Sequence, residues 1–298
     1  MLLGSHLSIG GGLHLALEKA HEFKFDTTAM FVRGQAQWHV PVLTAEAVRL
    51  FRETREKLGI SPIVAHGSYL VNLAGRKEVR DKSLVAMAAD LARCRRLGIE
   101  FLVMHPGANE DAKRGVEMIA AGLDEIYERL SEMAGDPANE IDSAVPWPRV
   151  LLETTAGCGN SIGGTFEQLA GIIAHAAQGD RLGVCLDTCH VFAAGHDFRT
   201  PEGYAAMMEH FDREIGLDRL FAIHLNDSKR ELGSHVDRHA HIGKGEIGLS
   251  GFRSFVNDPR LAMVPMILET PKGLREKDGR DWDRVNAQAV RRLVKKGR

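Results

Sequence analysis

The 298-residue sequence is poor in the features that mark secreted, membrane-spanning and redox-active proteins. Its four cysteines, Cys94, Cys158, Cys185 and Cys189, form no CxxC pair, which excludes a zinc ribbon or a dithiol motif. No stretch approaches about 18 uninterrupted apolar residues, and residues 1–12 place no Lys or Arg before their apolar positions. We therefore expect a reduced, cytoplasmic protein with no membrane partner.

The sequence also lacks an excess of positive charge. It carries 38 basic and 40 acidic side chains, a formal net charge of −2, so no overall field attracts nucleic acid or an anionic membrane. No GxGxxG or Walker motif opens a helical segment, which argues against a nucleotide cofactor. With 10 prolines and 44% hydrophobic residues, the chain is neither collagenous nor disordered. Histidine, in contrast, occurs 14 times without a tag-like run, which raises the expectation of a metal site.

Short apolar segments alternate with helical ones along the whole chain. The apolar runs are continuous, as in parallel strands buried on both faces. They are Leu2–Gly4, Thr28–Val32, Ile63–Ala65, Phe101–Met104, Val150–Leu152, Gly183–Leu186, Leu220–Ile223 and Met263–Leu268. Segments with a 3.6-residue period lie between them, for example Leu43–Leu58, Val79–Leu97, Val116–Met133, Phe166–Ala177, Tyr204–Ile215 and Val285–Val294. Thr44 and Thr165 are candidate N-caps, and Gly59 and Gly98 are candidate residues just past helix ends.

This alternation predicts the α/β class, as a (β/α)₈ TIM barrel rather than an open doubly wound sheet. We expect residues 1–298 to form a single domain with its active site at the carboxyl-terminal rim of the strands. The one linker-like stretch, Gly135–Pro148, is interpreted as a surface insertion on the side away from that rim.

Chemically active side chains follow seven of the eight apolar runs. They are His6, His66, His105, Glu153, Asp187, His224 and Glu269, and His190, Asp237 and His239 lie on nearby loops. Taken singly, such residues are usually helix caps, salt-bridge partners or structural histidines. Burying them together without cations would cost many kcal/mol, so the set predicts more than one metal ion. Asn226 and His241 are placed to support the ligands. Helices or polar loops carry His14, His21, His39, His175, His196, His210 and His235, which we expect at the surface.

Several longer motifs resemble the endonuclease IV family of zinc-dependent apurinic/apyrimidinic endonucleases, which have a TIM barrel. They are GSHLS at 4–8, QAQW at 35–38, HGSYLVNL at 66–73, MHPG at 104–107, LETTAG at 152–157, GVCLDTCHVFAAG at 183–195, HLNDSK at 224–229, VDRH at 236–239 and ILET at 267–270. Runs of this length are far more specific than a short pattern.

The resemblance implies three zinc ions. His66, His105 and Glu153 would hold the first; Glu153, Asp187, His224 and Glu269 the second; and His190, Asp237 and His239 the third. It implies hydrolysis of the phosphodiester 5′ to an abasic site, leaving a 3′-hydroxyl, and removal of 3′ blocking groups. A hydroxide between the first two ions would attack phosphorus, Glu153 and Glu269 would serve catalysis, and the third ion would stabilise the leaving oxygen.

The implied partner is double-stranded DNA with an abasic site, bound by a monomer. Four carboxylates and three zinc ions would leave a formal charge of +2 at the mouth, which the sequence count hides. Gln35, Trp38 and Tyr69 match the family's DNA-binding loops, and Arg33, Lys229, Arg238 and Lys244 are candidates for contacts with the DNA backbone. The sequence departs from the family at Ala36, where members usually carry a basic residue that helps to open the DNA at the lesion. We therefore expect this protein to bind the kinked DNA duplex less tightly.

Two other functions remain open from the residues alone. A sugar isomerase or epimerase also lines a barrel mouth with Glu, Asp and His around a divalent metal, although it usually needs fewer metal sites. A protein that binds lesions without cutting them is the other alternative. Nicking of abasic duplex separates both from a nuclease.

Overall fold

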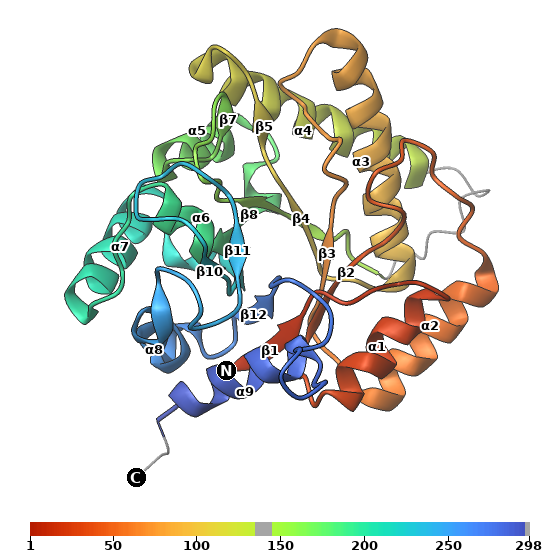
Figure 1. Ribbon diagram of the computed structural model, residues 1–298. Helices are drawn as coiled ribbons and strands as arrows, with labels where there is room; N and C mark the ends of the chain where they lie inside the picture. Colours follow the sequence, from red (N-terminus) through yellow and green to blue (C-terminus); the bar gives the residue numbers. More distant parts are fainter. Residues whose placement is uncertain (135–144, 296–298) are drawn as a thin grey trace.

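Eight parallel strands form the centre of the protein and helices surround them (Figure 1). The computed structural model describes residues 1–134 and 145–295. The barrel strands are β1 (Leu2–Ser5), β2 (Thr28–Phe31), β3 (Ile63–His66), β4 (Phe101–Met104), β6 (Arg149–Glu153), β8 (Leu182–Asp187), β9 (Leu220–His224) and β12 (Pro265–Leu268). Hydrogen-bonded neighbours run in the order β1-β12-β9-β8-β6-β4-β3-β2. The predicted TIM barrel is therefore confirmed.

The barrel closes between its first two strands. His6 and Ala29 form a parallel bridge, and the Leu7 amide donates to the Ala29 carbonyl at 2.8 Å. On the other side of β1, Leu2–Ser5 pairs in register with Pro265–Leu268 of β12. The chain thus joins its first strand to both its second and its last, as a closed barrel requires.

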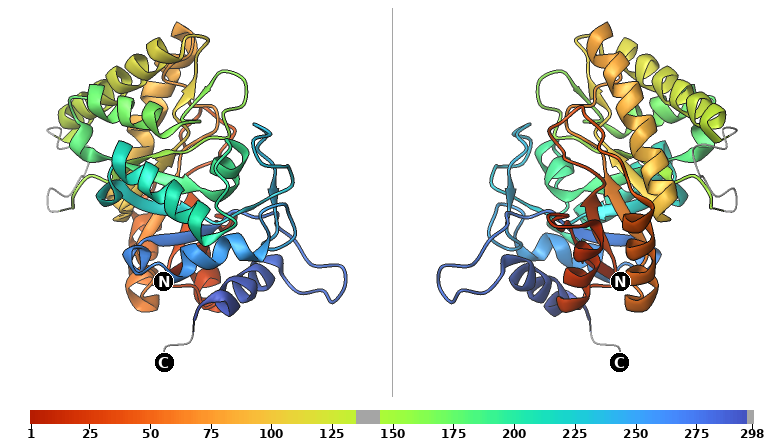
Figure 2. Two further views of the ribbon diagram at one scale, coloured as in Figure 1. Left: turned by 90° about the vertical axis from the view of Figure 1, so that its left-hand side faces the viewer. Right: turned by 90° about the vertical axis from the view of Figure 1, so that its right-hand side faces the viewer.

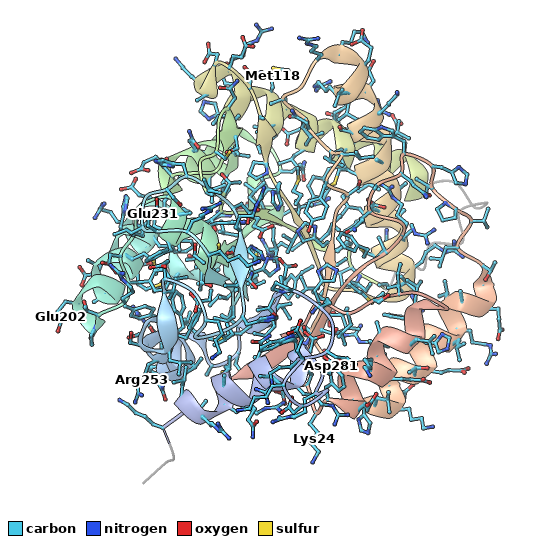
Figure 3. The ribbon with its side chains drawn as sticks, in the orientation of Figure 1. Lys24, Met118, Glu202, Glu231, Arg253 and Asp281 are labelled. Carbon is cyan, nitrogen blue, oxygen red and sulfur yellow. The ribbon has the colours of Figure 1, made fainter. Side chains whose placement is uncertain are left out.

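The surrounding helices follow the predicted alternation. They are α1 (Leu13–Glu22), α2 (Ala45–Leu58), α3 (Lys77–Leu97), α4 (Ala112–Ala134), α5 (Phe166–His175), α6 (Thr188–Ala193), α7 (Pro201–Glu214), α8 (Gly248–Asn257) and α9 (Trp282–Leu293). Exposed charged side chains on the outer helices, such as Glu202 of α7 and Arg253 of α8, lie at the periphery (Figure 3). No helix in the described ranges is long and apolar enough to span a bilayer.

The predicted helix ends are confirmed. Thr44 and Thr165 accept hydrogen bonds from the amides of Ala47 and Gln168, which satisfies a free N–H in the first turn of α2 and of α5. Gly59 and Gly98 end α2 and α3 at φ 66° and 75°, a left-handed conformation that glycine adopts without a Cβ penalty.

Two predicted segments need correction. The last strand begins at Pro265 and not at Met263, because Met263 lies in a turn with 78% of its surface exposed. Only residues 145–148 of the stretch Gly135–Pro148 lie within the described ranges. They adjoin Glu100 and Arg149, at the amino-terminal ends of β4 and β6, which agrees with a position away from the rim.

Two small antiparallel ribbons lie at the carboxyl-terminal rim of the barrel, opposite the amino-terminal ends of the strands. β5 (Gly107–Ala108) pairs with β7 (Ser161–Ile162), and β10 (Asp227–Ser228) pairs with β11 (His239–Ala240). Loops around residues 230–240 and 270–280 project from the same side of the barrel (Figure 2). These loops build the walls around the mouth.

Candidate metal centre

A buried layer inside the barrel decides which side chains reach the mouth. One residue from each of seven strands forms this layer: Ala29, Val64, Val103, Leu151, Cys185, Ala222 and Ile267. Side chains two positions apart in a strand point to the same side of the sheet. For six of these strands, the residue two positions beyond the layer is His66, His105, Glu153, Asp187, His224 or Glu269. The strand period therefore directs these six predicted ligands towards the mouth.

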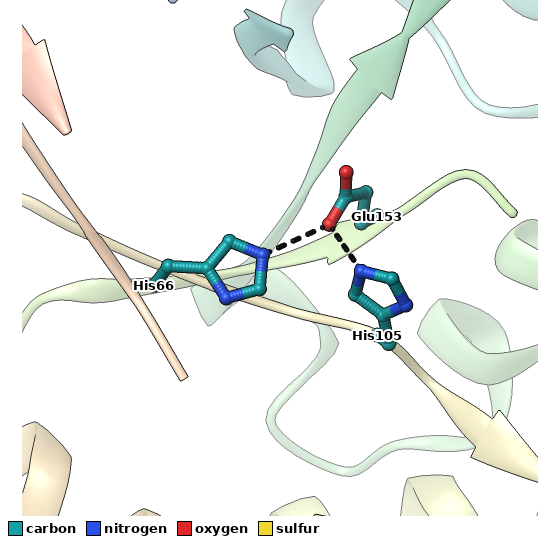
Figure 4. A group of neighbouring side chains, drawn as sticks. All are labelled: His66, His105 and Glu153. Atoms are coloured by element: carbon teal, nitrogen blue, oxygen red, sulfur yellow. Dashed lines mark hydrogen bonds and ion pairs between the residues drawn. The ribbon is translucent and has the colours of Figure 1, made fainter. Parts of the chain in front are cut away.

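The first cluster joins the ends of three neighbouring strands (Figure 4). Nε2 of His66 lies 3.2 Å, and Nε2 of His105 3.0 Å, from the same oxygen of Glu153, Oε2. Glu153 is completely buried and His66 nearly so. Two imidazole nitrogens and a carboxylate oxygen converging in this way are a donor set that zinc accepts.

The second cluster shares Glu153 with the first. Its other carboxylate oxygen, Oε1, lies 2.8 Å from Nδ1 of His224, and Oε2 of Glu269 lies 3.1 Å from the same nitrogen. Asp187 completes the group. Because Glu153 presents one oxygen to each cluster, it is placed to bridge two ions.

The third cluster lies on α6 and the hairpin that ends in β11. Asp237 presents one oxygen to Nε2 of His190 at 3.2 Å and the other to Nε2 of His239 at 3.3 Å. Nε2 of His239 is also 3.6 Å from Oδ2 of Asp187, so Asp187 lies between the second and third clusters. Asp187 also caps α6, accepting the His190 amide at 3.0 Å, which fixes His190 beside it.

Electrostatic coupling within the clusters is strong. Burial by itself would raise the pKa of Glu153 and Glu269, but neighbouring histidines, His224 among them, hold both values below the ordinary range. Burial would likewise lower the pKa of His190, yet Asp187, Asp237 and Glu153 raise it to about 10. These carboxylates therefore need positive charge nearby, which bound metal ions would also supply.

The tautomers of three histidines suit metal coordination. Nδ1 of His66, His190 and His239 faces a backbone carbonyl at 2.8, 2.7 and 3.2 Å, so in the neutral imidazole, the form that binds a metal, each Nε2 is the acceptor. Nε2 of His239 is buried and has no hydrogen-bond partner among the described residues, although two carboxylates face it. An orphaned nitrogen in this setting fits a divalent ion such as zinc.

Asn226 and His6 hold the carboxylates in place. Asn226, completely buried, donates to Oδ2 of Asp187 at 2.7 Å and accepts the Glu269 amide at 2.9 Å. Nδ1 of His6 lies 2.8 Å from Oε1 of Glu269. The expected supporting role of Asn226 therefore agrees with the geometry, and His6 acts on the ligand Glu269.

Three expectations about other side chains are wrong. Arg33 is 4% exposed and pairs with Asp90, so it offers no surface charge to DNA. His241 stacks on Trp282 with ring centroids 3.6 Å apart, and it does not touch the clusters. His196 and His210 pack against the ring of Phe166 and are half-buried, not free surface residues.

Two of the four proposed DNA contacts, Gln35 and Tyr69, lie at the mouth. Tyr69 is 57% exposed, and its ring lies 5.3 Å from that of His66. Gln35 and Tyr69 line a cavity of about 530 Å³ that also contains His6 and Glu269. Trp38 is half-buried against the core, and Arg238 is exposed beside Asp237.

Two residues near the third cluster were missed. Cys189 offers its sulfur close to Asp237 and His239, and the motif DTCH gave no reason to prefer it as a ligand over a buried structural thiol. Asp227 is completely buried and accepts amide hydrogen bonds from Ser228, Gly243, Gly245, Ile247 and Gly248 at 2.9–3.4 Å. Asp227 thereby fixes the hairpin that carries His239. The sequence signal that could have indicated this role is the motif NDS at 226–228, directly after the seventh barrel strand.

Replacing Asp227 with Asn should destabilise the protein. An amide keeps one acceptor oxygen but turns the other into a donor that faces backbone N–H groups, so the free energy of unfolding should fall by about 2–3 kcal/mol. Urea unfolding followed by circular dichroism measures this. Asp218→Asn, at an exposed position, is the matched control. Equal stability of the two variants would show that the five bonds do not hold the hairpin.

Comparison with known proteins identifies the family. A family model described as "Xylose isomerase-like TIM barrel" matches residues 17–294. "Probable endonuclease 4" of Geobacter sulfurreducens is 46% identical over 99% of this chain and 95% of its own length. The crystal structure of endonuclease IV from Thermus thermophilus superposes with a TM-score of 0.84 at 36% identity, covering 98% of each chain.

A structure of a D-tagatose 3-epimerase-like protein also aligns, with a TM-score of 0.69 at 20% identity over 98% of this chain and 97% of its own. Identity this low shows a shared fold alone. Together, the barrel and its rim of His, Asp and Glu define a barrel enzyme with a candidate polynuclear metal centre. Within that class, the chain belongs to the endonuclease IV family and is a nuclease hydrolase.

Proposed function

We propose that this protein cleaves double-stranded DNA on the 5′ side of abasic sites, leaves a 3′-hydroxyl, and removes 3′ blocking groups. The observation that carries the proposal is the convergence of nine side chains of the expected types into three clusters that share Glu153 and Asp187. Full-length similarity to proteins named endonuclease 4 supports the same reaction.

We assign three zinc ions to the clusters. His66, His105 and Glu153 would hold the first, and Glu153, Asp187, His224 and Glu269 the second. The third would take His190, Asp237 and His239. When bound, zinc ions lower the pKa of coordinated water towards about 7 and offset phosphate charge.

The chain's own residues prepare the site for this chemistry. Glu269 lines the cavity in which the scissile phosphate would lie, and His6 and Asn226 fix its orientation. Glu153 lies buried behind it and presents one oxygen to each of two clusters. Gln35 and Tyr69 line that cavity, and together with Trp38 and Arg238 they would bind the DNA strand that carries the lesion. We also propose that residues 1–298 act as a single domain and a monomer in the cytoplasm, where the four free cysteines stay reduced.

Restoring a basic residue at Ala36 should tighten binding. Ala36 is exposed in the segment that presents Gln35 and Trp38, so an arginine there would reach the DNA backbone or the gap at the lesion. We expect Ala36→Arg to lower the Kd for an abasic duplex about tenfold, measured by fluorescence anisotropy with zinc present and with Glu269→Gln introduced in both proteins to prevent cleavage. Ala177→Arg adds the same charge at an exposed position beyond α5 and controls for net charge. Equal affinities of the two variants would refute a wedge role for this position.

A further inference from the structure

The segment between β2 and α2 has no helix or strand of its own, yet it carries the proposed DNA contacts Gln35 and Trp38. Residues 32–44 pass beside α3 on the way to α2 (Figure 1). Residues 34–37 and His39 are exposed, so little apolar burial holds the middle of the segment. Apart from the packing of Trp38 against the core, its conformation therefore depends on polar contacts.

Side chains of α3 supply those contacts. Arg93 donates from Nε and Nη2 to the Val32 carbonyl at 3.0 and 2.8 Å, and from Nη1 to the Pro41 carbonyl at 2.7 Å. Arg96 donates to the Leu43 carbonyl at 3.0 Å. One helix face thus binds the segment near its start and near its end.

A buried ion pair holds the middle. Asp90 of α3 accepts Nε and Nη2 of Arg33 at 2.6 and 3.1 Å, and Nη1 of Arg33 donates to the carbonyl of Gln37. The Arg33 and Asp90 side chains are only 2% and 1% exposed. Burying two charges costs about as much as their attraction returns, so such a pair is a poor source of general stability. Its directional bonds instead determine where the Gln37 carbonyl, and with it the exposed turn, can lie.

From these contacts we infer that Asp90, Arg93 and Arg33 are positioning residues for lesion recognition, holding residues 34–38 in the geometry that engages DNA at the mouth. This inference rests on the proposed function. None of the three side chains is a member of the metal clusters. Releasing the segment should therefore weaken substrate binding and leave the turnover of bound substrate unchanged.

The test separates KM from kcat on an abasic duplex. Arg93→Met keeps the apolar stem and removes three bonds to the segment, so KM should rise about tenfold with kcat within about twofold of wild type. Arg93→Lys retains one donor group, so its KM should lie between that of the wild type and that of Arg93→Met. Hydrogen exchange should speed up in residues 32–43. Arg80→Met, on the same helix but paired with Glu125, is the matched control and should behave as wild type.

The charged pair provides a second, independent test. Replacing Arg33 with Met and Asp90 with Leu together removes both members of the pair and leaves Arg93 bound to the carbonyls of Val32 and Pro41, so the fold should persist while KM rises as in Arg93→Met. Wild-type KM in both variants, or an equal loss in kcat, would overturn the inference while leaving the proposed function intact. If the wild-type protein does not cleave abasic duplex at all, the proposed function fails, and this inference fails with it.

Discussion

Replacing Glu269 with Gln is expected to lower kcat for cleavage of an abasic duplex by about 10³-fold while leaving the fold intact. Glu269 presents Oε2 to His224 at 3.1 Å and Oε1 to His6 at 2.8 Å, at the wall of the cavity proposed to hold the scissile phosphate. An amide has nearly the same shape but removes one of the anionic oxygens around the second ion. Cleavage should be measured with saturating substrate, and folding by circular dichroism.

Glu167→Gln is the matched control, because Glu167 lies exposed at the start of α5 and outside the three clusters that form the centre. Its kcat should equal that of the wild type. Glu153→Gln is expected to resemble Glu269→Gln, since Glu153 presents an oxygen to each of two clusters. Turnover within tenfold of wild type in either glutamine variant would contradict a shared carboxylate centre.

Removing bound metal should abolish cleavage and lower the melting temperature by about 10 °C. Without cations, the centre confines four carboxylates and five imidazoles, most of them buried, and their repulsion and desolvation oppose folding. A single ion that binds only the folded state and is present at about 1,000 times its Kd adds about 4 kcal/mol, which corresponds to about 10 °C in a chain of this size, so the loss of even one ion accounts for the shift. Thermal unfolding after treatment with a chelator and dialysis measures the loss.

Readdition of zinc should restore both the melting temperature and the cleavage activity. Asp237→Asn should lose part of the thermal shift, because Asp237 faces His190 and His239 of the third cluster and belongs to neither of the other two clusters. A chelated protein that melts at the same temperature and still nicks DNA would contradict a role for metal in both stability and catalysis.

The sequence was sufficient to predict the barrel and the six proposed ligands that follow its strands, because both depend on local patterns. Continuous apolar runs marked the strands, and the fixed two-residue period of a strand carries the side chain after each run to the mouth. His66 and Glu153 illustrate this, since each lies two positions beyond a residue of the inner layer. Asp237 and His239 were recognised as a pair on the loop after the seventh strand, but no strand period places them, and only the family resemblance assigned them to a third ion.

Other features could not be predicted because they depend on contacts between distant segments. Arg33 and Asp90 are 57 residues apart, and nothing local to Arg33 indicates that an acid of α3 will bury it. His241 was expected to support the ligands because it lies two residues after His239 in the sequence, but its ring stacks on that of Trp282 instead. Helix α6 was missed because its signal is short and starts at Asp187, a residue assigned only to metal.

The most direct test of the proposed function is nicking of a synthetic duplex containing one abasic site, with metal content measured on the same protein sample. We expect a cut on the 5′ side of the site that leaves a 3′-hydroxyl, and about three zinc ions per chain. Zinc-loaded protein that binds the duplex but leaves it uncut, or that acts on free sugars instead, would contradict the proposed function.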